Sequence, residues 1–442
     1  MTEGSIIKQV VLFSLPLMLG NAFQMLYNTV DSVVVGNFVG TQALAAVGST
    51  TMIVNMLVYF FNGFSAGAGV VISHHFGARQ TDRLHTAIET AMLFTFLMSV
   101  LLSVVGVLAV RPLLRLMATP EDVFDEAALY LKIYCGGVSG LLIYNMSSSI
   151  LRAVGDSTRP LYFLIFTSVL NIALDLFFVL VLRMGIAGVA WATVIAQFVS
   201  AMLTLLLLTR SKDVYRLTWK DMRIDWAILR QVIGLGLPTG IQAIITSVSN
   251  VFVQSYINAF GSACMAGWSS YNKLEQLCML PMQSLTTAAT IFVGQNIGAK
   301  KHQRAERGTT DMMLLIVGVE AVLAAVLFAI AAPAVGLFSQ DAAVIGFGVL
   351  FMRTNVVFQP INGIAQIHAG ALRGRGDSRG PTIILLASFV AVRQVYLYFI
   401  TRFVANTPTS VCIGFPVGWT VCCAAMLIYY HFWGKRKSIS AA

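Results

Sequence analysis

The stretch LRAVGDSTRP, residues 151–160, returns later in the chain as LRGRGDSRGP, residues 372–381. The two copies lie 221 residues apart, half the length of the 442-residue chain. Three further blocks repeat at this offset or within one residue of it: HHFGAR (74–79) as QNIGAK (295–300), NFVG (37–40) as NAFG (258–261), and SLPLMLG (14–20) as GLPTGIQ (236–242). Four separated blocks at nearly one offset predict two copies of one fold.

The composition is that of a protein buried in a membrane. The chain is 57% hydrophobic and 11% charged, whereas about a quarter of the residues in soluble domains are charged. Runs of about twenty apolar residues, the length that spans a bilayer as a helix, predict an all-α polytopic protein with twelve transmembrane helices. The predicted spans are 8–36, 43–72, 86–110, 127–151, 160–182, 186–209, 230–258, 263–293, 308–331, 342–371, 381–403 and 409–433.

Basic residues are distributed unevenly between the two sides of these spans. Of the 29 Lys and Arg residues, 21 fall in one alternating set of polar gaps. This set includes Lys8, Lys220 and the consecutive residues Lys435, Arg436 and Lys437. The opposite set holds only Arg111, Arg115, Arg183 and Arg402. The positive-inside rule therefore places both termini in the cytoplasm. Because topology accounts for the net charge of +10, nucleic-acid binding is not indicated.

The repeat and the spans together predict the domain organisation. Residues 1–209 and 230–442 each hold six spans, and the highly charged segment 210–229 joins them in the cytoplasm. An even number of spans makes both six-helix bundles enter the membrane in the same direction, with a pseudo-two-fold axis along the membrane normal. Two such bundles leave a cleft that can open to either side, which favours transport. The alternative is a structural membrane protein whose duplication has no mechanistic meaning.

Four acids fall well inside the predicted spans: Asp31, Asp175, Glu275 and Glu320. A mid-helix acid costs about 2.5–3.5 kcal/mol to insert into a membrane, so each is a functional candidate. Two of them end stripes of polar residues at spacings of three and four, which place each stripe on one helix face. The stripes are Asn21, Gln24, Asn28 and Asp31, and Ser168, Asn171 and Asp175.

Both stripes reach a similar depth. At the helical rise of about 1.5 Å per residue, Asp175 lies about 22 Å into its span, and Asp31 lies at a similar level of the first helix. Thr193 descends to the same layer from the other side. The sequence therefore predicts a cation site made of Asp31, Asn171, Asp175 and Thr193. With Lys132 the sole cation inside the spans of this half, the two acids would share a proton or hold a hard cation such as Na⁺.

The repeat provides an internal control for this cluster. At the offset of 221, Asn171, Asp175 and Thr193 correspond to Val392, Tyr396 and Gly414, and at 222 Asp31 corresponds to Val253. The second half thus keeps the helices and loses the cluster. Residues that only stabilised a six-helix bundle would be needed in both bundles, so this asymmetry favours a functional role.

The second half carries its own interior charges, Lys273, Glu275, Arg353 and Arg393. We expect the cations to pair with the acid and stabilise the bundle, with a role at the cleft wall as the alternative. Glu320 has no evident partner. Six scattered cysteines without CxxC spacing indicate no metal or disulfide framework. The absence of Walker A, HExxH and G-x-S-x-G motifs predicts a protein that is not an enzyme and needs no cofactor beyond a coupling ion.

The chain resembles the multidrug and toxic compound extrusion (MATE) family, in particular its bacterial multidrug-exporting branch. The residues that carry the resemblance are 14–40, FGAR (76–79), RAVGDSTRP (152–160), NIALD (171–175) and YNKLEQ (271–276). The resemblance implies two six-helix lobes that export organic, often cationic, compounds in exchange for Na⁺ or H⁺. It also implies that the amino-lobe cation site is Asp31, Asn171, Asp175 and Thr193. An acid that some members carry on the seventh helix has no counterpart within 230–258.

These expectations define a mechanism by alternating access. Cation or proton occupancy would bias the amino lobe between two packings, with Pro16 as a kink in the first helix. Organic substrates would bind in the cleft between the lobes, for which the candidate contacts are Gln24, Tyr27, Gln242, Glu275 and Met279. We expect a monomer in the bacterial inner membrane, in contact with lipid. The rival functions are a flippase for a lipid-linked oligosaccharide or polysaccharide precursor, and a channel.

Overall fold

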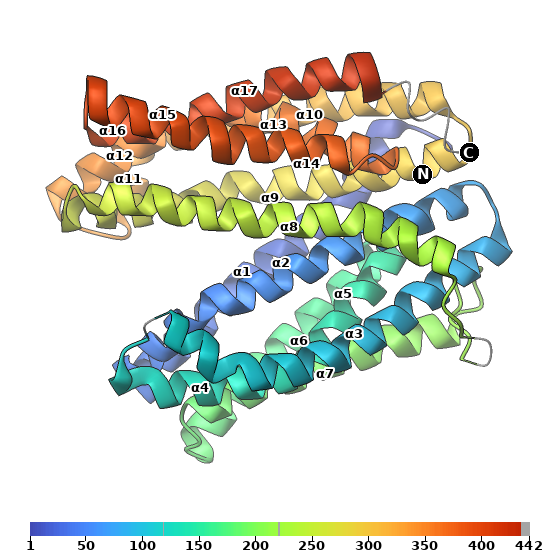
Figure 1. Cartoon of the computed structure of the whole chain (residues 1–442), viewed down its shortest axis with the longest axis horizontal. Coiled ribbons are helices and arrows are strands. Elements are labelled where there is room, and N and C mark those ends of the chain that lie inside the picture. The colour runs from blue at the N-terminus through green and yellow to red at the C-terminus, as the bar shows by residue number, and fades with distance from the viewer. Residues whose placement is uncertain (118, 220–221, 435–442) are drawn as a thin grey trace. The chain divides into compact units, whose positions relative to one another are not determined.

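The computed structural model describes residues 1–117, 119–219 and 222–434 (Figure 1). Over these residues the chain is helical and contains no β-strand. Lys220 and the terminal basic cluster that contributed to the orientation argument (435–437) lie outside the described residues. The helices, in chain order, are α1 (Ile6–Val34), α2 (Thr41–Gly77), α3 (Thr81–Leu116), α4 (Glu121–Gly136), α5 (Val138–Ala153), α6 (Thr158–Leu176), α7 (Ile186–Arg210), α8 (Trp226–Asn258), α9 (Ser262–Gly298), α10 (His302–Ala329), α11 (Ala331–Gly336), α12 (Ala342–Val356), α13 (Gln359–Gly374), α14 (Arg379–Leu386), α15 (Arg393–Phe399), α16 (Pro408–Cys412) and α17 (Gly414–Tyr429).

The helices account for the twelve predicted spans. Ten helical segments in the described chain are long and apolar enough to cross a membrane. Two further spans are pairs of helices that bend, α4 with α5 by 46° and α12 with α13 by 50°. These bent pairs occupy corresponding positions in the two halves. The all-α, twelve-span prediction is confirmed.

The repeated stretch LRAVGDSTRP is a turn between two spans. In the first copy, α5 ends, Gly155 adopts a positive φ of 99°, and the Asp156 carboxylate accepts from the backbone N–H groups of Thr158 and Arg159, both at 3.1 Å. In the second copy, Gly376 has a φ of 88° and Asp377 accepts from the N–H of Gly380 at 3.0 Å. Glycine reverses the chain without strain, and the acid caps the next helix.

The described chain divides into two compact units, one of residues 15–236 and one of residues 1–14 with 237–442. We call them the amino unit and the carboxy unit. These boundaries differ from the predicted 1–209, 210–229 and 230–442. The repeat places the boundary where the linker lies, but α1 begins in the carboxy unit and α8 begins in the amino unit. Each helix changes unit just before an internal proline, Pro16 in α1 and Pro238 in α8.

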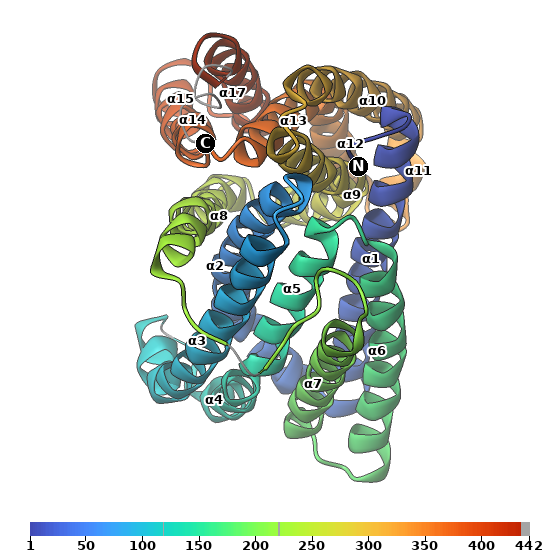
Figure 2. The same ribbon diagram turned by 90° about the vertical axis from the view of Figure 1, so that its right-hand side faces the viewer.

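Within the amino unit, α7 packs against both α5 and α6 (Figure 2). This arrangement brings the polar stripe of α6 to the face of α7 that carries Thr193. An apolar core around Val35, Leu131 and Val189, all fully buried, fixes the ends of α1, α4 and α7 on which the site depends. The carboxy unit has its own core, which includes Trp268, Phe351 and Leu397.

Candidate functional site: a buried carboxylate pair in the amino unit

The four residues predicted for the cation site come from three helices of the amino unit. Asp31 lies near the end of α1, Asn171 and Asp175 lie on α6, and Thr193 lies on α7. Asp175 is fully buried, Asn171 and Thr193 are 2% and 5% exposed, and Asp31 is half-buried. Shortly after each acid, the helix continues as a π-helical turn, Val35–Val39 after Asp31 and Phe177–Val181 after Asp175. Such turns are frequent at functional sites.

The structure brings these four residues together. The side chains of Asp31 and Asp175 lie within hydrogen-bonding reach of each other. When the Asn171 amide is oriented to satisfy both of its neighbours, its nitrogen donates to Oδ2 of Asp175 at 3.3 Å and its oxygen accepts from the backbone N–H of Thr193 at 3.2 Å. The Thr193 hydroxyl donates to the carbonyl of Val189 at 3.1 Å. The spacing of the polar stripes therefore predicted the neighbours correctly.

The acids of this site have little compensation. Oδ1 of Asp31 and Oδ1 of Asp175 are both buried without a hydrogen-bond partner in the described part of the chain. The ion pairs found there do not involve either acid. Lys132, which the sequence placed inside this half, is exposed on α4. Two adjacent buried carboxyl groups without a cation cannot both be ionised at low cost. They can share one proton or take up a small cation.

Two tyrosines lie near the pair, and a third tyrosine and a glutamine lie next to them. Tyr27 on α1 and Tyr130 on α4 lie within electrostatic range of both carboxyl groups. Tyr134, one turn after Tyr130, stacks on it at a ring-centroid distance of 6.3 Å and lies beside Gln197 of α7. Sequence reasoning missed Tyr130, Tyr134 and Gln197. A signal existed, because Gln197 follows Thr193 by four residues, and Tyr130 and Tyr134 share one helix face.

The donor set of the site is limited. Two oxygens are free, whereas the Asn171 amide oxygen already accepts from a backbone N–H. No group of three or more His, Cys, Asp or Glu side chains that could hold a metal ion occurs among the residues described. Two carboxylate oxygens suit one shared proton. To serve Na⁺, the site would need the Asn171 amide reversed and the Thr193 oxygen recruited, since hard cations take several oxygen ligands.

The predicted substrate contacts fall in different units. Gln24, exposed, and Tyr27, half-buried, belong to α1 of the amino unit. Gln242, Glu275 and Met279 belong to the carboxy unit. There, Gln242 accepts from Arg373 at 2.9 Å and Glu275 accepts from Gln359 at 3.0 Å. The structure thus places each predicted contact only within its own unit. A substrate cleft formed by all five residues stays a prediction.

The expected pairing of charges in the carboxy unit is wrong. Lys273 lies over the ring of Phe338 at 5.2 Å, and Arg353 lies over Phe328 at 5.1 Å. Among the described residues neither forms an ion pair with Glu275, which takes an amide partner instead. An aromatic face or a neutral amide satisfies each group with less loss of hydration than a buried ion pair would require.

Arg393 is a buried cation of the carboxy unit. It is 4% exposed, and its Nη2 donates to the Ser249 hydroxyl and to Oδ1 of Asn250, both at 2.8 Å. Its guanidinium lies 4.8 Å from the ring centroid of Phe415. Its Nε is buried without a partner in the described structure. Arg393 therefore ties α15 to α8 and α17 through neutral groups.

Glu320 of α10 is fully buried. Both of its carboxyl oxygens are without a hydrogen-bond partner in the described structure. Cys278 of α9 lies beside it. The sequence suggested no partner, and the described residues provide no cation.

The comparison with known protein families gives one match in each half of the internal repeat. The model of the MatE family matches residues 16–177 and matches again at residues 238–399. The chain belongs to the MatE family. Both halves of this MatE chain carry the match, which confirms the resemblance noted in the sequence. The protein is accordingly a multi-pass transporter of the cell membrane, not an enzyme.

Several known proteins are similar to this MatE chain over nearly its whole length. The probable multidrug resistance protein YoeA of Bacillus subtilis (strain 168) is 28% identical, over 99% of this chain and 96% of that protein. YpnP of the same organism, also a probable multidrug resistance protein, is 28% identical, over 99% and 98%. The structure of an outward-facing multidrug resistance MATE family transporter matches with a TM-score of 0.91 and 23% identity, covering 99% of this chain and 97% of that one.

Proposed function

We propose that this protein exports organic compounds, many of them cationic, in exchange for protons, and that Asp31 and Asp175 form the coupling site. The observation that carries the proposal is the pair of buried carboxyl oxygens that no described residue satisfies. A buried polar atom without a partner calls for a ligand such as a proton, an ion or a water molecule. The names of the relatives support multidrug export as the activity.

Protons are favoured over Na⁺ as the coupling ion by the state of Asn171. In the amide orientation that satisfies both neighbours, its nitrogen donates to Asp175 and its oxygen accepts from the Thr193 N–H. In this arrangement the amide stabilises a carboxylate and offers no ligand to a metal ion. Two neighbouring acids that share one proton already form a site whose charge changes by one when the proton leaves.

The proposed cycle couples this charge to the packing of the amino unit. Loading of the pair with a second proton from outside neutralises it, and release to the cytoplasm restores the charge. A ligand shifts a conformational equilibrium only by its differential affinity for the two states. Pro16, in the same helix as Asp31, is where α1 can change its bend. Substrate would occupy the cleft contacts predicted above, with Met279 adapting to different shapes.

The orientation follows from the distribution of basic residues, with both termini in the cytoplasm. In this orientation the inward-directed proton gradient of a respiring bacterium would drive export. We propose that a monomer suffices, because all four residues of the coupling site come from one chain and one unit.

The test is dye transport by the full chain in proteoliposomes under imposed gradients. Ethidium accumulation or release would be followed with a pH gradient and no Na⁺, and with a Na⁺ gradient at equal pH. The proposal predicts transport in the first condition and none in the second. Transport driven only by Na⁺ would contradict proton coupling, and flux independent of any opposing gradient would indicate a channel.

Two variants connect the flux to the site. Asp31→Asn and Asp175→Asn remove one ionisable group each at nearly constant volume, and both should abolish gradient-driven transport. Asp125→Asn is the matched control, since Asp125 is an exposed acid of the same unit that pairs with Arg111 at 3.1 Å. Normal coupling in both site variants would contradict the proposal.

A further inference from the structure

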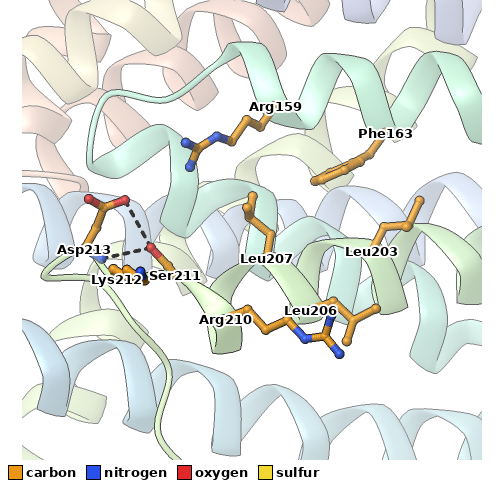
Figure 3. A pocket seen from close by; sticks show the side chains of 9 residues that line it. All are labelled: Arg159, Phe163, Leu203, Leu206, Leu207, Arg210, Ser211, Lys212 and Asp213. Carbon is orange, nitrogen blue, oxygen red and sulfur yellow. Dashed lines mark hydrogen bonds between the residues drawn. The ribbon is translucent and has the colours of Figure 1, made fainter.

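A pocket at one end of α6 and α7 has a lining that neither the coupling site nor the substrate cleft uses. Its volume is about 440 Å³, within the range of ligand-binding pockets. Figure 3 shows Arg159 and Phe163 of α6 facing the stretch of α7 that carries Leu203 and Leu207, with the Arg159 side chain extending toward the end that holds Ser211 and Asp213. Leu206, Arg210, Ser211, Lys212 and Asp213 complete the lining.

The lining is divided by chemistry. Phe163 and the three leucines come from the interiors of two helices that are candidate membrane spans. The charged residues come from the ends of those helices, since α6 begins at Thr158 and α7 ends at Arg210. The mouth is therefore cationic at the level where the span meets water, and the wall below it is apolar.

Two of the three cations at the mouth are available. Arg210 and Lys212 are exposed, and neither side chain forms a hydrogen bond or an ion pair within the described ranges. Arg159 is engaged more, through Nε with Asp156 at 3.3 Å and through Nη1 with the Tyr215 hydroxyl at 2.8 Å.

The single acid of the lining is held by its own neighbours. Asp213 accepts from the Tyr215 hydroxyl at 2.8 Å and from the Ser211 hydroxyl at 3.1 Å through the same oxygen, Oδ2. These two hydrogen bonds lower the pKa of Asp213, so it is ionised at neutral pH. Three cations against one acid leave the mouth with a net positive charge.

We propose that this pocket binds an anionic glycerophospholipid, with the phosphate between Arg210 and Lys212 and an acyl chain along Phe163, Leu203 and Leu207. The positive-inside rule explains why basic residues gather on this side, but not why they rim an apolar pocket. Basic pockets between transmembrane helices on the cytoplasmic side are suited to anionic headgroups. A free phosphate compound would use the cations and leave the apolar wall in water.

The site is separate from the coupling site. Arg159 and Asp175 lie sixteen residues apart on one helix, which corresponds to about 24 Å along its axis. The proposal depends on the proposed function only for the cytoplasmic placement of this end. Loss of lipid binding with normal proton coupling, or the reverse, would distinguish the two proposals.

The test is native mass spectrometry of the full chain in detergent, titrated with dioleoyl phosphatidylglycerol or with dioleoyl phosphatidylcholine. The wild type should retain phosphatidylglycerol more strongly than phosphatidylcholine. Arg210→Gln with Lys212→Gln should reduce that preference by more than about tenfold, since each basic residue near a membrane surface contributes about fivefold to anionic lipid affinity. Arg307→Gln with Arg379→Gln removes the same charge from exposed positions in the other half and should leave the preference unchanged.

Two outcomes would overturn the proposal. Equal loss in the control pair would mean that general surface charge, and not the pocket, selects the lipid. Competition by glycerophosphoglycerol, the same headgroup without acyl chains, at concentrations similar to the lipid would mean that the apolar wall is not used and the site takes a soluble phosphate. Leu207→Asn tests the apolar wall. It should weaken lipid retention without changing the weak binding of the deacylated headgroup.

Discussion

The two bundles place opposite charges at closely corresponding positions of the repeat. In the amino unit, Asp31 and Asp175 meet between α1 and α6 with two buried oxygens unsatisfied. In the carboxy unit, Arg393 joins α15 to Asn250 of α8. By the repeat offset, Arg393 corresponds to Ile172, and Asn250 corresponds to Asn28. The corresponding helix pair thus holds an acidic pair in one bundle and a guanidinium in the other.

The difference lies in how far each group is satisfied. Arg393 makes two hydrogen bonds at 2.8 Å through Nη2 and lies on an aromatic ring, while its Nε has no partner in the described structure. The carboxylate pair has one amide donor and no described cation. A satisfied buried charge stabilises a fold, whereas an unsatisfied one requires something that binds and leaves. We infer that the paired-acid site belongs to the amino unit alone, since Glu320, the unsatisfied buried acid of the carboxy unit, lies beside Cys278 and not beside a second acid.

The largest loss of transport is expected from a substitution at Asp175. Asp175→Asn should reduce pH-driven ethidium transport to less than about a tenth of the wild-type rate, because the Asp31 carboxyl that remains has no second acid with which to share a proton. The thermal unfolding of the purified protein should change little, since the amide has nearly the same volume. The measurements are transport in proteoliposomes and a thermal unfolding curve in detergent. Unaltered transport would show that the acidic pair is as structural as Arg393.

The converse substitution tests the carboxy unit. Arg393→Met should lower the free energy of unfolding by about 1 kcal/mol, because two hydrogen bonds are lost, while the buried Ser249 hydroxyl keeps a donor in Gln394 at 3.1 Å and the Asn250 side chain is exposed. Coupling to the pH gradient should persist in the folded fraction. Arg353→Met is the control, since Arg353 is an exposed cation of the same unit whose ring contact is worth about 0.5 kcal/mol. A folded Arg393→Met protein that transports without any pH dependence would place a coupling role in both bundles.

The fold could be predicted in full outline because two independent patterns, hydropathy and the repeat, agree. The site could be predicted because helical spacing fixes which side chains share a face and the helical rise fixes their depth. The charge pairs of the carboxy unit could not, since a sequence does not reveal whether Lys273 has Glu275 or the Phe338 ring as its nearest partner. Tyr130 and Tyr134 were missed for a related reason, because aromatic residues in an apolar span are typical of ordinary packing.

The two copies of the repeated turn should differ in how much their acids contribute to the stability of the fold. Asp377 is 8% exposed and accepts from the Tyr429 hydroxyl at 2.6 Å besides capping α14. Asp156 caps α6, and it also pairs with the guanidinium of Arg159, which is largely in water. Asp156→Ala should cost about 1 kcal/mol, the value of a helix cap, and Asp377→Ala about 2 kcal/mol, because the hydroxyl of the half-buried Tyr429 also loses an acceptor. Thermal unfolding of both variants measures the difference, and equal losses would contradict the assigned contacts.

The smallest effect is expected at Thr193. Its hydroxyl already donates to the Val189 carbonyl within the same helix, so Thr193→Val should change pH-driven transport by less than about twofold. If Na⁺ were the coupling ion, the hydroxyl oxygen would be one of its few ligands and the same substitution would severely weaken Na⁺-driven transport. Initial rates of ethidium transport under each gradient, compared between wild type and Thr193→Val, decide between the two ions.

Proton release on substrate binding shows whether Asp31 and Asp175 hold the exchangeable proton. Purified protein in weakly buffered detergent solution would be mixed with ethidium while the pH is recorded, for the wild type and for Asp31→Asn with Asp175→Asn. We expect the wild type to release protons on binding and the double variant to bind ethidium without releasing any. Equal proton release by the double variant would show that the exchangeable proton resides elsewhere and that the acidic pair of the amino unit is not the coupling site.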